Sequence, residues 1–167
     1  ATTARFGIIA KQAHLPFDVK KAGTFKVVER YKGTGVTDFG VPETIASCDR
    51  LPLTGKEAER CAALLEASWV VLGRVVAHAP ASLRKGPRGG GRDRDQIVEH
   101  VEGAEESYGR AIGLRIKDVN ERRAAFLKAV RSGSEPTPGK GWPVRYFVRR
   151  TAWHVIDHTW EIEDKSE

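Results

Sequence analysis

Residues 54–79, TGKEAERCAALLEASWVVLGRVVAHA, have the pattern of a long amphipathic helix. The helix begins with the capping box Thr54–Glu57, in which a Thr and a Glu each satisfy a free amide of the first turn. It should end near Ala79, because Pro80 follows. Apolar side chains recur at the three- and four-residue spacing of one helix face: Ala58, Cys61, Leu65, Trp69, Leu72 and Val76. This stretch predicts a helical core.

Three further helices are predicted over residues 93–113, 118–130 and 143–164. Asp93 with Gln96, and Asp118 with Glu121, have the spacing of capping boxes at the first two of these helices. The inward stripe of the first consists of Ile97, Val101, Ala104, Tyr108 and Ala111 or Ile112. Together with the opening helix, they predict a mainly α fold in which residues 53–167 form an antiparallel four-helix bundle.

Segments rich in Gly and Pro separate these helices. Residues 81–91 contain Gly86, Pro87 and the run Gly89–Gly91, and they are expected to be a mobile connection. Residues 132–141 hold two prolines and three glycines and should end the third helix.

Residues 1–52 have a different pattern. The short apolar run Phe6–Ala10 and the alternation over Phe25–Tyr31 are strand candidates. Glycines and prolines punctuate the region at intervals typical of turns. We therefore predict an N-terminal extension over residues 1–52 that forms a β-hairpin or a small sheet beside the bundle.

Composition excludes several classes of protein. With 40% hydrophobic and 30% charged residues, the 167-residue chain is neither disordered nor a membrane protein by composition. The apolar stretch Ala67–Ala77 is interrupted by Gly73 and Arg74 and is shorter than a membrane span. Ala1–Arg5 lacks the features of a signal peptide, which predicts a cytoplasmic protein. The net charge of +6 alone is weak evidence for an acidic partner.

Three histidines form a candidate metal site. His154 and His158 are four residues apart, so they project from one side of the last helix about 40° apart. His100 lies at the same border of the apolar stripe on the second helix. Imidazole is a common ligand of divalent metal ions. A single histidine at such a position is more often structural, but the convergence of three favours one metal ion bound by His100, His154 and His158.

The amino-acid sequence around these histidines resembles that of a known family. Arg149–Asp164, RRTAWHVIDHTWEIED, resembles the last-helix signature of the DinB/YfiT-like family, and Ile97–Tyr108, IVEHVEGAEESY, resembles its second helix. The resemblance covers about residues 54–164 and implies a four-helix bundle that binds a divalent ion, zinc or nickel, through the same three histidines. It also implies a thiol-dependent transferase or a hydrolase, a low-molecular-weight thiol cofactor and a homodimer.

The function within that resemblance stays open at this point. Three protein ligands leave positions free on the ion, and a divalent ion lowers the pKa of a water or thiol bound to it, so hydrolysis and thiol transfer are both available. The substrate would be a small molecule. The alternative is a non-catalytic metal- or ligand-binding protein. Nucleic-acid binding is disfavoured because the chain has no interleaving of aromatic and basic residues.

Several carboxylates and the cations of one loop are further candidate residues near the predicted metal site. Glu161, three residues after His158, either orients a metal-bound imidazole or is a surface acid that pairs with an Arg or Lys, whereas Asp157 and Glu105 are expected to be solvated. Five cations crowd the glycine-rich loop, where they can attract an anion or simply face solvent: Arg84, Lys85, Arg88, Arg92 and Arg94. Trp153 and Trp160 are expected to pack on a helix or at a subunit contact. His14 and His78 have no partner at metal spacing.

Overall fold

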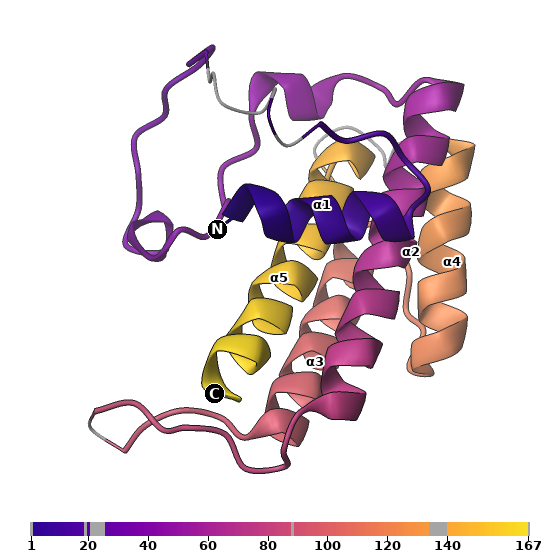
Figure 1. Cartoon of the computed structure of the whole chain (residues 1–167). Coiled ribbons are helices and arrows are strands. Elements are labelled where there is room, and N and C mark those ends of the chain that lie inside the picture. The colour runs from indigo at the N-terminus through magenta and orange to yellow at the C-terminus, as the bar shows by residue number, and fades with distance from the viewer. Residues whose placement is uncertain (1, 19, 21–25, 88, 134–139, 167) are drawn as a thin grey trace.

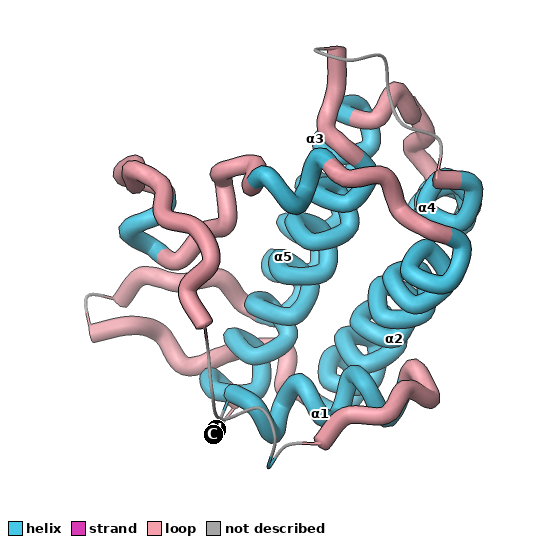
Figure 2. Tube along the Cα trace, turned by 90° about the horizontal axis from the view of Figure 1, so that it is seen from above, coloured by secondary structure: helices cyan, strands magenta, loops and turns pink. Residues whose placement is uncertain are grey.

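The computed structural model describes residues 2–18, 20, 26–87, 89–133 and 140–166. These residues form five α-helices and two short 3₁₀ helices, in chain order α1 (Thr2–Gln12), η2 (Thr37–Phe39), η3 (Ser47–Arg50), α2 (Gly55–His78), α3 (Arg94–Ala111), α4 (Val119–Ser132) and α5 (Val144–Lys165). Within these described ranges there is no strand (Figure 2). The mainly α prediction is therefore confirmed.

The capping residues set the helix starts as predicted. The backbone N–H of Thr54 donates to the Glu57 carboxylate at 3.2 Å, and α2 starts at the next residue. Asp93 and Gln96 form the same kind of capping box at the start of α3. At α4 the Asp118 carboxylate accepts from the N–H of Glu121 at 2.9 Å. Because these contacts are local, the sequence alone could locate the helix starts.

One apolar core joins α2, α3, α4 and α5. Helix α2 packs against α4 and α5, and α3 packs against the same two helices (Figure 1). The side chains at the centre are fully buried, and each of the four helices contributes: Leu65, Ile97, Phe126, Phe147 and Ile162. On α2 the predicted stripe is correct, although Cys61 and Val76 are only half-buried at the edge of the core. This packing fixes α3 beside α5.

The predicted strand at Phe6–Ala10 is wrong, because these residues lie within helix α1. Ile9 is 4% exposed and packs with Ala67 and Val71 of α2 and with Ile156 of α5. The Phe6 ring makes an edge contact with Trp160. A short apolar run fits a buried strand or one turn of helix equally well by pattern alone. Here it forms a helix whose apolar side chains pack on α2 and α5. Figure 1 shows α1 crossing the other helices.

The second predicted strand, at Phe25–Tyr31, is wrong over its described part. Residues 26–31 have no regular secondary structure and are exposed, and Phe25 lies outside the described residues. The following segment is attached to α5 by polar contacts. Asp49 of η3 is 1% exposed and pairs with Arg149, and the Tyr146 hydroxyl donates to the Glu43 carbonyl at 2.7 Å. The predicted division at residues 52 and 53 stays a prediction.

Glu105 is buried, contrary to the prediction that it is solvated. It is 1% exposed and accepts hydrogen bonds from Trp69 Nε1 at 2.7 Å and from Arg123 Nε at 3.0 Å. Next to it on α3, Gly109 faces the core, where an added Cβ would lie 3.1 Å from the Phe126 ring. The core face of α3 thus passes through Glu105 and Gly109 as well as the predicted Ile97 and Val101, because α2 and α4 supply partners for the charge.

Helix α2 also contains an 18-residue window long and apolar enough to cross a membrane, with a mean hydropathy of 1.4. The core helix of a soluble protein meets the same criterion, and the apolar face of α2 packs against α1, α4 and α5. We therefore assign α2 to the core of the bundle.

Candidate metal centre

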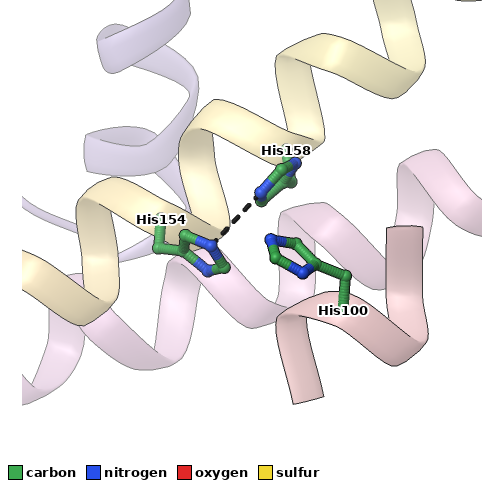
Figure 3. A group of neighbouring side chains, drawn as sticks. All are labelled: His100, His154 and His158. Atoms are coloured by element: carbon green, nitrogen blue, oxygen red, sulfur yellow. Dashed lines mark hydrogen bonds between the residues drawn. The ribbon is translucent and has the colours of Figure 1, made fainter. Parts of the chain in front are cut away.

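The structure brings the three predicted histidines together. His154 and His158 come from successive turns of α5, and His100 comes from the neighbouring α3 (Figure 3). Each residue offers one ring nitrogen, and these three nitrogens lie within 4.8 Å of one another. His154 and His158 are 7% and 8% exposed, and His100 is half-buried. The cluster therefore lies at the edge of the core, with His100 on its more open side.

The spacing of the two nitrogens on α5 fits one ion. The Nε2 atoms of His154 and His158 are 3.2 Å apart. Two nitrogens that bind one tetrahedral zinc ion at about 2.0–2.1 Å would lie roughly 3.3 Å apart. The same contact is also a hydrogen bond if one of the two Nε2 atoms carries a proton. The donor set, three imidazoles, suits zinc, nickel and related ions.

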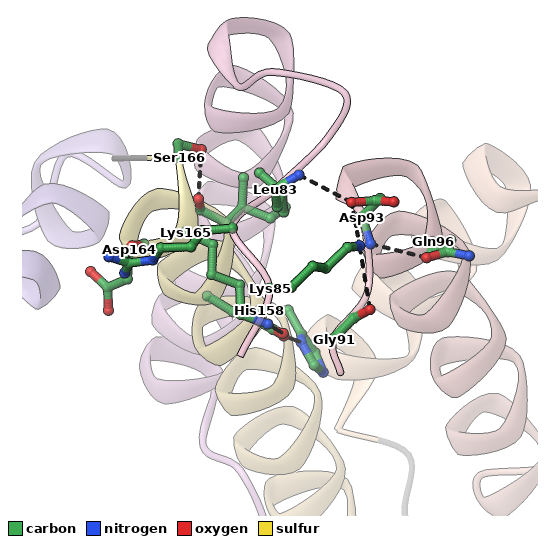
Figure 4. A network of polar contacts seen from close by, with 12 residues as sticks. Leu83, Lys85, Gly91, Asp93, Gln96, His158, Asp164, Lys165 and Ser166 are labelled. Carbon is green, nitrogen blue, oxygen red and sulfur yellow. Dashed lines mark hydrogen bonds and ion pairs between the residues drawn. The ribbon is translucent and has the colours of Figure 1, made fainter. Parts of the chain in front are cut away.

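Glu161 holds the ring of His158. Its Oε2 lies 2.6 Å from Nδ1 of His158, and its other oxygen accepts from Lys165 Nζ one turn later (Figure 4). When Nδ1 donates to the carboxylate, the Nε2 lone pair of His158 is free to face the cluster. Burial raises the pKa of Glu161, but the hydrogen bonds from Lys165 and His158 outweigh it and lower the pKa overall. This is the carboxylate–histidine arrangement typical of metal ligands.

The surroundings of His100 and His154 keep these two imidazoles uncharged. Burial, followed by the neighbouring His158 and His100 and the charges of Arg150 and Arg92, lowers the pKa of His154 to about 3. Burial and Arg92 also lower the pKa of His100. A neutral imidazole is the form that binds a metal ion, so at neutral pH the lone pairs of both residues are available.

The glycine-rich loop lies beside the same end of α5. The backbone N–H and the guanidinium of Arg84 donate to the carbonyls of Lys165 and Asp164 at 3.0 and 2.8 Å. Lys85 pairs with Asp93 at 2.5 Å, which connects the loop to the start of α3 (Figure 4). The loop, which we predicted to be a mobile connection, thus contacts α5 and α3.

The five cations of this loop differ in their surroundings. Arg84 and Lys85 make the bonds described above, Arg94 pairs with Asp95, and Arg88 lies outside the described residues. Arg92 is exposed and pairs with no described residue, and its charge acts on His100 and His154. Three of the five cations are thus bonded to groups of the chain itself, and the attraction of an anion by this loop stays a prediction.

Sequence reasoning missed Arg150, one turn before His154 on α5. Its guanidinium lies over the rings of Tyr108 and Trp153, at 5.3 and 4.9 Å from their centroids. The Tyr108 ring in turn contacts the His154 ring, with centroids 5.7 Å apart. The spacing of Arg150, His154 and His158 by four residues could have pointed to it.

The remaining candidates are distributed as follows. Asp157 is exposed, as predicted, while Trp153 stacks with Arg150 and Trp160 packs on α1. Packing on another helix is thus confirmed for Trp160, whereas for Trp153 it stays a prediction. His14 and His78 are exposed and take no part in the histidine cluster.

No family model matches the chain, and no curated protein or solved structure shows significant similarity to it. The resemblance to the DinB/YfiT-like family, the cytoplasmic location and the homodimer stay predictions.

Proposed function

We propose that the protein is a DinB-like antiparallel four-helix bundle that binds one divalent metal ion, zinc or nickel, through His100, His154 and His158. The observation that carries this proposal is the convergence of the three ring nitrogens within 4.8 Å of one another. The Glu161 carboxylate on His158 and the neutral state of His154 support it. Three neutral ligands leave coordination positions open for a further group.

We further propose a metal-dependent enzyme of the thiol-dependent transferase or hydrolase type. A divalent ion with open positions supplies Lewis-acid activation of a thiol, a water or a carbonyl oxygen. Within the chain, Glu161 holds the tautomer of His158, and Lys165 fixes the position of Glu161. The partly exposed side of the cluster at His100 is where a small substrate would reach it.

The test combines metal binding with turnover. Cobalt-loaded protein is titrated with a low-molecular-weight thiol such as N-acetylcysteine and, separately, assayed with chromogenic esters. A thiolate-to-cobalt charge-transfer band with thiol-dependent turnover supports the transferase, whereas ester cleavage that needs the metal supports the hydrolase. His154→Ala should abolish either signal, and His78→Ala, which removes an exposed histidine of α2, should retain it.

The second candidate is a non-catalytic metal- or ligand-binding protein. Two surface hollows of the described residues lie away from the histidine cluster, one at the start of α2 beside Lys56 and Arg60, and the other beside Arg5 and His78. If a ligand binds in one of these hollows and not at the ion, the ion would have a structural or sensory role. In that case chelation should lower the melting temperature, while no substrate in a broad panel is turned over. Metal-dependent turnover of any substrate contradicts this candidate.

A further inference from the structure

Arg150 is held rigidly at the side of the histidine cluster. On α5 it precedes His154 by one turn, as His154 precedes His158, so the three side chains follow one line along the helix. Its guanidinium stacks on Tyr108 of α3 and Trp153 of α5. Both aromatic rings also neighbour His154, with centroids 5.7 and 6.2 Å from its ring. The guanidinium and the His154 ring therefore have the same two aromatic neighbours.

The guanidinium of Arg150 forms no hydrogen bond with the residues that the structure describes. Its NH1 atom is buried, and it has no hydrogen-bond partner. No ion pair or hydrogen bond joins Arg150 to any residue that the structure describes, unlike Arg145 and Arg149 on the same helix, which pair with Glu57 and Asp49. Leaving a buried donor unpaired is unfavourable, so such a group is expected to bind a partner that the chain itself does not supply.

The charge balance of the site selects an anion. A divalent ion held by three neutral imidazoles keeps its full charge, and Arg150 and the exposed Arg92 have the same sign. Of the nearby acids, Glu161 is engaged by His158 and Lys165, and Asp157 is exposed. The planar, pre-organised fork of an arginine matches the two oxygens of a carboxylate.

We infer that Arg150 binds the carboxylate of a small-molecule ligand or substrate beside the metal ion, with Tyr108 and Trp153 holding the guanidinium in place. This inference rests on the proposed metal site and specifies the class of substrate: a small carboxylic acid.

The experiment titrates acetate into the cobalt-loaded full chain at constant ionic strength and follows the visible absorption of the ion. Acetate should give a saturable change, and neutral acetamide should give none. Arg150→Gln should weaken acetate binding about tenfold or more, and Arg150→Lys, which keeps the charge without the fork, should weaken it less. Arg110→Gln is the matched control, because it removes the same charge from an exposed site on α3.

The outcomes separate the two proposals. If the wild-type chain binds no cobalt, the proposal of a metal site is wrong, and the inference about Arg150 is overturned as well. If cobalt binds but acetate produces no saturable change, or if Arg150→Gln binds acetate as tightly as the wild type, only the carboxylate site is overturned. If Arg150→Gln loses the ion, Arg150→Lys decides: weaker acetate binding in the cobalt-loaded variant supports the inference, and unchanged binding overturns it.

Discussion

Replacing Glu161 tests whether the histidine cluster is organised as a metal site. The Glu161 carboxylate lies 2.6 Å from His158 Nδ1 and is the acceptor that orients this ring. Glu161→Gln keeps an oxygen acceptor but removes its charge, whereas Glu161→Ala removes the acceptor. Neither change replaces a predicted ligand. An effect on metal affinity would therefore act through the orientation and basicity of His158.

The size of the effect follows from the bond. A hydrogen bond to a charged group contributes about 1.5–3 kcal/mol, and 1.4 kcal/mol corresponds to roughly a tenfold change in a binding constant. The side chains of His158 and Glu161 are only 10% and 24% exposed, so solvent screens the bond little. Glu161→Ala should weaken metal binding by about 10- to 100-fold, and Glu161→Gln by about tenfold.

The assay is competition for zinc with a chromogenic chelator at neutral pH. Glu163→Gln serves as the control, because Glu163 lies on the same helix and pairs with Arg5, 3.9 Å away, instead of with a histidine. The control should bind zinc as the wild type does. Equal zinc affinity in wild type, control and Glu161→Ala would refute the reasoning, provided that circular dichroism shows all three to be folded.

Two further predictions concern the bundle that carries the site. Glu105→Ala should lower the free energy of unfolding by about 3–5 kcal/mol in urea titration, because it leaves the partly buried Arg123 without its partner. Burial raises the pKa of Glu105 above its ordinary 4.5 despite Arg123. The contribution of Glu105 to the free energy of unfolding is thus largest below pH 4.5 and falls as the pH rises through the raised pKa. Glu105→Gln should remove this part of the pH dependence, and stability curves of equal shape for the wild type and Glu105→Gln would contradict the assignment. Gly109→Ala should destabilise the protein by about 1–3 kcal/mol through its contact with Phe126. Gly103→Ala, at an exposed helical position with open space around it, should instead stabilise the protein by about 0.5–1 kcal/mol, and thermal melts measure both variants. Similar melting of the two alanine variants would show that Gly109 does not face the core.

The sequence predicted best what is determined locally. Thr54, Asp93 and Asp118 lie at the helix starts because a cap and its partner are three residues apart, and the chain needs nothing distant to form them. The histidine pair on α5 could be predicted for the same reason, since the spacing of four residues determines the shared helix face.

Features that depend on distant partners were missed. The apolar run at Phe6–Ala10 forms a helix that packs on α2 and α5. No pattern within the run can show this packing. Glu105 is buried because Trp69 and Arg123, from α2 and α4, supply donors for its oxygens. Arg150 joins the site because Tyr108 of α3 stacks on it. Each of these follows from packing between helices.

The most direct measurement is elemental analysis of the untagged, full-length chain beside its single-histidine variants. We expect about one equivalent of a divalent transition metal per wild-type chain and its loss in His100→Ala, His154→Ala and His158→Ala. His78→Ala should keep the full equivalent. A wild-type chain that takes up no metal from zinc or nickel solutions, or a folded His154→Ala variant that retains a full equivalent, would contradict the metal site.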